Sequence, residues 1–169
     1  VIAWHISNEY SGQCHCPLCQ KAFQEYLKEK FHGDIGELNR AYWTTFWSHT
    51  YDRFDQIEPP GALTETGIHG LNLDWKRFIT RQTISFIENE IAPIREHCPH
   101  LPVTTNMMYE FTDLDYHKVA QVLDFASWDS YPEWHNGDDT VIAQRAAFWH
   151  DVYRSLKQKP FLLMESTPS

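Results

Sequence analysis

Residues 1–10, VIAWHISNEY, show the pattern on which the fold assignment rests: a short apolar run that gives way to a polar pair. Val, Ile and Trp in residues 1–7 favour a β-strand, and Asn8-Glu9 predicts where that strand ends. The same pattern recurs further along the chain, at residues 101–106, 122–129 and 161–164, and Glu165 follows the last run. We therefore predict four strands, each ending in polar side chains.

Apolar residues at helical spacing fill the intervals between these strands. The predicted helices cover residues 17–31, 34–43, 74–97, 113–120 and 140–158, with Asp74 as the N-cap of the long one. Residues 44–72 are expected to be irregular. The alternation predicts a parallel α/β structure. A (β/α)8 barrel and a doubly wound sheet both place ligands at the carboxyl ends of their strands, so the alternation alone does not choose between them.

Composition narrows the class of function. The chain has 169 residues, enough for one domain, and its net charge of −9 argues against a nucleic-acid binder, which needs a basic face. No apolar run approaches the roughly 20 residues of a membrane span, so we expect no membrane partner. Aromatic residues make up 15% of the chain, which fits either a large aromatic core or stacking surfaces for sugar rings.

The chain lacks a starting Met, shows no signal peptide, opens on a strand-like run and ends without a closing helix. We expect it to be a fragment. An open four-stranded parallel sheet leaves two unpaired edges, which favour association with other strands. We therefore expect the chain to pair with a second copy, as a homo-oligomer, or with its missing half.

Two carboxylates stand at predicted strand ends, Glu9 and Glu165. Hydrolysis of a glycosidic bond needs two carboxyl groups flanking that bond, about 5–5.5 Å apart when the sugar's configuration is retained. Each glutamate taken singly is also consistent with an ordinary surface acid. Their shared placement after apolar strands favours a catalytic pair.

Several motifs in order along the chain resemble a known enzyme family. Ile6-Ser7-Asn8-Glu9-Tyr10 resembles the strand-4 motif of the clan A glycoside hydrolases, and residues 161–166, FLLMES, resemble their strand-7 nucleophile motif. The segments at 14–19, 38–48, 103–107 and 127–132 make the chain similar to the family 42 β-galactosidases. The resemblance implies that residues 1–169 form a single segment of a (β/α)8 barrel, a partial TIM barrel covering about strands 4 to 7.

The resemblance also implies an activity and its principal residues. The activity is retaining hydrolysis of terminal β-D-galactosides, so the expected partner is a galactoside substrate, with no organic cofactor. Glu9 would be the general acid/base, which holds a proton until it is needed. Glu165 would be the ionised nucleophile that forms a galactosyl-enzyme intermediate. Asn8 would hydrogen-bond the sugar 2-hydroxyl.

Other residues are implied to support the sugar or the nucleophile. Tyr131 would donate a hydrogen bond to Glu165, although a buried tyrosine with a satisfied hydroxyl is the simpler reading. Trp47 would form a wall of the sugar site, with Trp43 as the weaker candidate, and core packing competes for both. Asn106 and Asp129 are expected to line the pocket.

Cys14, Cys16 and Cys19 form a Cys-x-Cys-x2-Cys cluster, a spacing that suits tetrahedral Zn²⁺. The resemblance implies a structural zinc with a fourth cysteine from an earlier segment, which this chain lacks. His15 or water is the alternative fourth ligand, and free thiols or a local disulfide are alternatives to metal. Cys98 is expected to be a plain buried thiol. Clustered thiols favour a reducing compartment, and so a cytoplasmic location.

A second hypothesis treats the chain as a non-catalytic, zinc-stapled half-barrel with little or no activity in isolation. The two hypotheses are compatible, because a full-length enzyme can hydrolyse galactosides while an isolated piece of its barrel does not.

Overall fold

A computed structural model describes residues 1–61, 66–134 and 136–166. Its contacts divide the chain into two compact units. We call Val1–Ser11 together with Gln82–Ser169 the strand unit, and Gly12–Arg81 the helical unit. The long helix α3 (His69–His97) contributes residues to both units.

The strands of the strand unit all pair in parallel. Strand β1 (Trp4–His5) pairs with β2 (Val103–Thr104), while β3 (Asn106–Met107), β4 (Ser127–Ser130) and β5 (Leu162–Ser166) form a second ladder in that order. Only Thr105 separates β2 from β3. The parallel α/β arrangement predicted from the sequence is therefore present, in strands shorter than expected.

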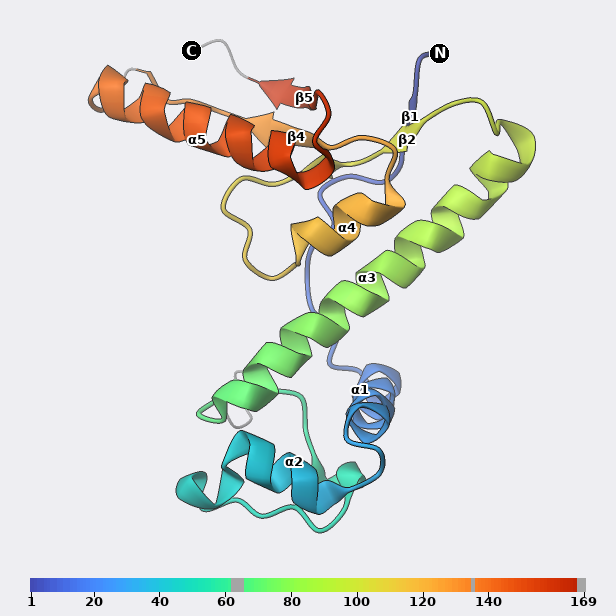
Figure 1. The fold of residues 1–169 in the computed structure, drawn as a ribbon, viewed down its shortest axis with the longest axis vertical. Helices are drawn as coiled ribbons and strands as arrows, with labels where there is room; N and C mark the ends of the chain where they lie inside the picture. The colour runs from blue at the N-terminus through green and yellow to red at the C-terminus, as the bar shows by residue number, and fades with distance from the viewer. Residues whose placement is uncertain (62–65, 135, 167–169) are drawn as a thin grey trace. The chain divides into compact units, whose positions relative to one another are not determined.

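Helices α4 (Tyr116–Val122) and α5 (Asp139–Lys157) belong to the same unit, and Figure 1 shows β4 and β5 side by side with α5 alongside. Trp128 of β4 is fully buried, and its ring stacks on Tyr153 of α5 at 4.7 Å between centroids. Contact between these two large rings removes apolar surface from water, which stabilises the packing of α5 on β4. The packing fixes the position of β4, whose carboxyl end carries Asp129.

The helical unit contains α1 (Pro17–Lys30), α2 (Ile35–Tyr42), the 3-10 turns η1 (Thr44–Trp47) and η2 (Phe54–Gln56), and the first part of α3. Phe23, Trp75 and Phe78 form its aromatic core, with ring centroids 4.9–5.4 Å apart. Asp34 caps α2 by accepting a hydrogen bond from the Glu37 backbone N–H at 3.0 Å, and the helix predicted for residues 34–43 is confirmed.

The predicted start of the long helix at Asp74 is wrong. Helix α3 begins at His69, and the Asp74 side chain is completely buried within it. The Asp74 carboxylate accepts hydrogen bonds from Lys30, from Tyr42 and, at 2.9 Å, from Arg77. Two tertiary donors, Lys30 and Tyr42, and Arg77 one turn along the same helix stabilise the carboxylate there, so Asp74 does not act as the N-cap that the local sequence predicts.

The predicted strand at residues 122–129 begins too early, because Val122 still belongs to α4 and β4 starts at Ser127. The apolar run at 161–164 lies in a strand, as predicted, although its Leu162 and Leu163 are 41% and 39% exposed in this chain. Strand β5 lies at the edge of its ladder. An apolar run predicts a strand, but it does not indicate whether neighbouring elements bury both faces of that strand or whether the strand lies at the edge of its sheet. Among the described residues, no helix combines the length and hydropathy needed to cross a bilayer.

Candidate active site at the strand ends

The carboxyl ends of the parallel strands bring polar side chains together in the strand unit. Asp129 and Glu165 are paired residues of the β4–β5 ladder, and Asn106 begins β3. Asn8 and Glu9 follow β1. In parallel α/β folds this edge of the sheet is where ligands bind.

Asn106 is the centre of this group and is 1% exposed. Its side-chain nitrogen lies 3.0 Å from Asn8 Oδ1, 2.7 Å from Asp129 Oδ2 and 3.1 Å from Glu165 Oε1. An amide nitrogen carries two hydrogens, so three acceptors share them. One buried side chain thus ties together groups from three segments.

The side-chain oxygen of Asn106 binds the backbone of Glu9, the first catalytic candidate. Its Oδ1 accepts a hydrogen bond from the Glu9 backbone N–H at 3.0 Å and lies 2.9 Å from His5 Nε2. Glu9 has a φ of 45°, in the left-handed region that costs energy for a residue with a side chain. The hydrogen bond from Glu9 N–H helps to hold this turn.

Glu165 is held from two sides. Asn106 donates to its Oε1, and the Tyr131 hydroxyl donates to its Oε2. The hydrogen bond to the carboxylate raises the pKa of Tyr131 to about 12. Tyr131 is 47% exposed, which does not fit the simpler reading of a buried tyrosine.

Asp129 is a third carboxyl in the group and is only 2% exposed. Burial raises the pKa of Asp129 to about 6; the Asn106 hydrogen bond opposes this shift, and the nearby Glu165 and Glu9 carboxylates add to it. Its Oδ1 atom is buried without a hydrogen-bond partner among the described residues. The sequence predicted that Asp129 lines the pocket but did not indicate that the charges of both glutamates act on it.

A cavity of ≈ 370 Å³ adjoins this group beyond the end of β4. Tyr131 lines the cavity and also contacts Glu165, so the two features share a wall. On another wall, Arg145 lies over the Tyr109 ring at 4.9 Å and pairs with Glu110 at 2.6 Å. This cavity could not be predicted from the sequence, because its lining residues come from the end of β4, from loops and from α5.

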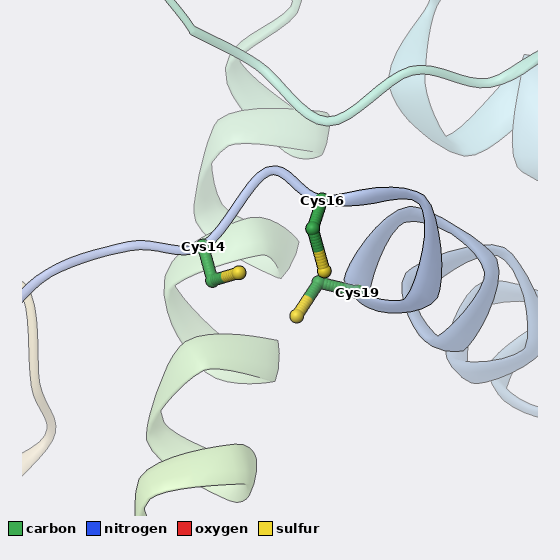
Figure 2. Close-up of side chains that lie close together, drawn as sticks. All are labelled: Cys14, Cys16 and Cys19. Carbon is green, nitrogen blue, oxygen red and sulfur yellow. The ribbon is translucent and has the colours of Figure 1, made fainter.

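The cysteine cluster lies in the helical unit, where Figure 2 shows the Cys14, Cys16 and Cys19 side chains close together. Their sulfur atoms lie within 4.8 Å of one another. Cys16 is the N-cap of α1, and the Cys19 backbone N–H lowers the pKa of Cys16 to about 7. A hydrogen bond with Cys14 raises the pKa of Cys19 to about 12.

The cluster fits three of the four positions of a tetrahedral metal site, whose thiolate sulfurs would lie ~3.8 Å apart. All four cysteines of the chain are free thiols, so the local disulfide is not formed. Within the described ranges, no other His, Cys, Asp or Glu joins the group. The His15 ring instead packs near Trp75, at 5.1 Å between centroids. Cys98 follows α3 and is half-buried.

Trp47 lies in η1 of the helical unit, 36% exposed, with its ring 5.9 Å from His69. Trp43 is 67% exposed and stacks on Phe46 at 4.8 Å. Neither ring is buried within this chain. The role of Trp47 as a wall of the sugar site stays a prediction.

Comparisons with known proteins agree with one another. A family model described as β-galactosidase, glycoside hydrolase family 42, matches residues 1–169. The chain is 56% identical to β-galactosidase BglY of Alicyclobacillus acidocaldarius over 170 residues, which is 100% of this chain and 25% of that protein. It is 54% identical to β-galactosidase GanA of Bacillus subtilis, covering 26% of that protein.

Solved structures give the same answer. The chain superposes on Gan42B, described as a family 42 β-galactosidase, with a TM-score of 0.95 at 58% identity, covering 99% of this chain and 26% of that one. The cold-adapted β-galactosidase of Rahnella sp. R3 gives a TM-score of 0.96 at 55% identity, covering 99% of this chain and 25% of that one. A second Gan42B structure, matched at 57% identity, is described as a catalytic mutant with a glutamate replaced by alanine.

These likenesses confirm the fold class, a segment of a TIM-barrel enzyme. The chain spans about a quarter of the length of the relatives it matches. The comparisons therefore support a segment of about a quarter of a family 42 enzyme. They do not support the predicted placement of this segment at strands 4 to 7 of the barrel.

Proposed function

The chain belongs to the family 42 glycoside hydrolases, the β-galactosidases, and from this premise we propose that the full-length protein is a retaining β-galactosidase in which Glu9 and Glu165 are the catalytic pair. The observation that carries the proposal is the buried Asn106 side chain, which binds the Glu9 backbone and the Glu165 carboxylate at once. The names of the relatives favour this function over a non-catalytic half-barrel.

Glu165 is the proposed nucleophile because both of its oxygens accept hydrogen bonds, from Asn106 and from Tyr131. Hydrogen bonds donated to a carboxylate favour its ionised form. The ionised Glu165 attacks the anomeric carbon and forms a covalent glycosyl-enzyme intermediate. Tyr131 keeps the attacking carboxylate oriented.

Glu9 is the proposed acid/base. It gives its proton to the glycosidic oxygen as the leaving group departs, and later removes a proton from the water that hydrolyses the intermediate. Asn8 uses its side-chain oxygen to accept from Asn106. Its amide hydrogens are then the part of the side chain suited to bind the sugar 2-hydroxyl. The exposed face of Trp47 supports its assignment as a stacking wall.

The test uses the full-length protein and nitrophenyl β-galactoside. Glu165→Gln should lower kcat by more than the roughly 10²–10⁴-fold that acid–base catalysis contributes. Glu9→Gln should be less impaired on this substrate than on lactose, because nitrophenolate leaves without a proton. Glu29→Gln, which breaks an exposed pair with Arg81, is the matched control and should leave kcat unchanged. Normal activity of Glu165→Gln would remove the nucleophile assignment.

We also propose that the cysteine cluster holds a structural Zn²⁺, because three sulfurs converge at the start of α1. Zinc analysis of the full-length protein should give one ion per chain, and Cys14→Ser should lose it. Cys98→Ser is the matched control and should retain the metal. Equal zinc in the wild-type protein and Cys14→Ser would exclude this site. Cysteines that form no disulfide with one another are consistent with the proposed cytoplasmic location.

We also propose that edge strand β5, on which Leu162 and Leu163 are exposed in this chain, pairs with a second copy of the chain or with the rest of the barrel. Gel filtration of this chain should show an oligomer, and a compact monomer would contradict the proposal.

A further inference from the structure

We propose, on the basis of the function proposed above, that Glu90 of α3 is a positioning residue that holds the turn carrying the acid/base Glu9. The Glu90 carboxylate binds the side chains of Ser7 and Tyr10, the residues on either side of Asn8-Glu9. Glu90 acts on the placement of Glu9, and no step of the reaction passes through Glu90 itself.

The turn that carries Glu9 has an unfavourable backbone conformation. Ser7 has a φ of 42° and Glu9 a φ of 45°, both in the left-handed region that is disfavoured for residues with a side chain. Two such residues within three positions persist only where the surrounding structure holds them. Asn106 supplies one such contact, by accepting a hydrogen bond from the Glu9 backbone N–H at 3.0 Å. That bond lies in the middle of the turn, so the ends of the turn need partners of their own.

Glu90 is the partner of both ends. The Ser7 hydroxyl donates to Glu90 Oε1 at 2.7 Å, and the Tyr10 hydroxyl donates to Glu90 Oε2. Hydrogen bonds that a carboxylate accepts are stronger than those between neutral groups. Burial and the hydrogen bond to Glu90 raise the pKa of Tyr10, so its hydroxyl keeps the proton that it donates. One carboxylate therefore closes the turn from residue 7 to residue 10.

The position of Glu90 is itself fixed by the core of the strand unit. Glu90 is half-buried, and Ile87 and Ile91 on the same helix are 0% and 8% exposed. Both isoleucines belong to the same buried cluster as Ile6, the residue that precedes the turn. The clamp therefore joins the turn to a packed helix, which is the kind of support that keeps a reacting group in place.

The chemistry of Glu9 makes its placement measurable. Proton transfer requires that the acid lie within hydrogen-bond reach of the leaving oxygen, and a misplacement of about 1 Å can cost roughly 100-fold in rate. The leaving group of lactose is a sugar alkoxide, which needs the proton of Glu9 as the glycosidic bond breaks and the bond to Glu165 forms. Dinitrophenolate leaves without a proton. A misplaced Glu9 should therefore slow the reaction of lactose and largely spare that of a dinitrophenyl galactoside.

The experiment measures kcat/KM of the full-length protein on lactose and on a dinitrophenyl β-galactoside. Glu90→Ala should lower kcat/KM on lactose by roughly 10- to 100-fold and on the dinitrophenyl substrate by much less. Glu90→Gln keeps an acceptor at this position and should recover most of the activity on lactose. Glu88→Ala is the matched control, because Glu88 is exposed and lies two positions earlier on α3. That variant should leave both values unchanged.

Tyr10→Phe is the second variant, and it decides the question if Glu90→Ala does not fold. It removes one of the two hydrogen bonds to Glu90 but keeps the ring, which lies edge-on to Phe86 at 6.0 Å between centroids. It should show the same preference for the dinitrophenyl substrate, with a smaller loss on lactose than Glu90→Ala.

Each outcome decides a separate question. A loss confined to lactose in Glu90→Ala or Tyr10→Phe, with Glu88→Ala unchanged, supports the clamp. Equal losses on both substrates, or no loss on either, overturn the inference and leave the proposed function standing. Glu9→Gln is measured on the same two substrates. A Glu9→Gln variant without the preference, or a wild-type protein that hydrolyses no galactoside, overturns the proposed function and the inference together.

Discussion

Two buried aspartates, Asp74 in the helical unit and Asp129 in the strand unit, have surroundings that shift their pKa values in opposite directions. Burial acts to raise the pKa of Asp74, but hydrogen bonds from Lys30, Tyr42 and Arg77 outweigh it and hold that pKa below its usual range. Burial also raises the pKa of Asp129, to about 6, and its neighbours include two more carboxylates and no cation among those found to act on it in the described chain.

The difference separates a structural carboxylate from one at a reactive site. The helical unit surrounds its buried charge with donors, so the charge holds α1, α2 and α3 together. The strand unit gathers like charges at the strand ends, which costs folding free energy. Such unbalanced groups are concentrated at catalytic sites, where perturbed proton affinities are useful.

The largest change in the free energy of unfolding is expected from Asp74→Ala. It leaves two cations and a phenol without their acceptor, and should lower the free energy of unfolding by about 3–5 kcal/mol at pH 7. Because the folded pKa of Asp74 is depressed, its stabilisation is present at neutral pH and is lost as pH falls below about 4. Urea unfolding at pH 7 and pH 3 measures both. Glu29→Gln, which removes one partner of an exposed ion pair in the same unit, should lower the free energy of unfolding by at most about 1 kcal/mol. Equal losses in the two variants would contradict the comparison.

Asp129→Asn should change stability in the other direction. A raised pKa means that the folded state holds the proton more tightly than the unfolded chain, so this group's contribution falls as pH rises from about 4 to about 6. At pH 8 the variant should be more stable than the wild type by about 2–3 kcal/mol, which corresponds to about two pKa units. The gain should vanish near pH 4. A destabilised variant at pH 8 would show that Asp129 is balanced by a partner.

Asn106→Ala tests how tightly the strand-end group is held. Loss of the bonds to Glu9 and Glu165 should lower kcat by roughly 10- to 100-fold through misplacement, with a smaller change in KM. Asn39 is the matched control in the helical unit, because its amide binds Tyr51 and Thr44 in a similar way. Asn39→Ala should reduce stability and leave kcat unchanged. Similar kcat losses in both variants would mean that the effect is general destabilisation.

The residues of the site could be predicted from the sequence, but the contacts and the charge balance among them could not. Asn8, Glu9 and Glu165 were identified because motifs at strand ends are local in sequence. The central contacts of Asn106 were not, because its partners at positions 5, 8, 9, 129 and 165 are brought together only by the parallel ladders. The cavity beside Tyr131 likewise depends on how a loop packs against α5.

The fold shows the same division. Helices α1, α2 and α5 were predicted to within one or two residues, since proline, Asp34 and apolar spacing act locally. The start of α3 was wrong because Asp74 reads as a cap in isolation and acts as a buried tertiary acceptor in the fold. The exposure of Leu162 could not be predicted, because it depends on the neighbours of an edge strand.

The most direct test of the catalytic pair is covalent trapping in the full-length protein. A 2-deoxy-2-fluoro-β-galactoside with a good leaving group slows hydrolysis of the glycosyl-enzyme more than its formation, so the labelled peptide can be found by mass spectrometry. The proposed mechanism predicts one fluorogalactosyl group, attached to Glu165. A label on Glu9 or Asp129, or turnover that yields the inverted sugar with no label, would contradict it.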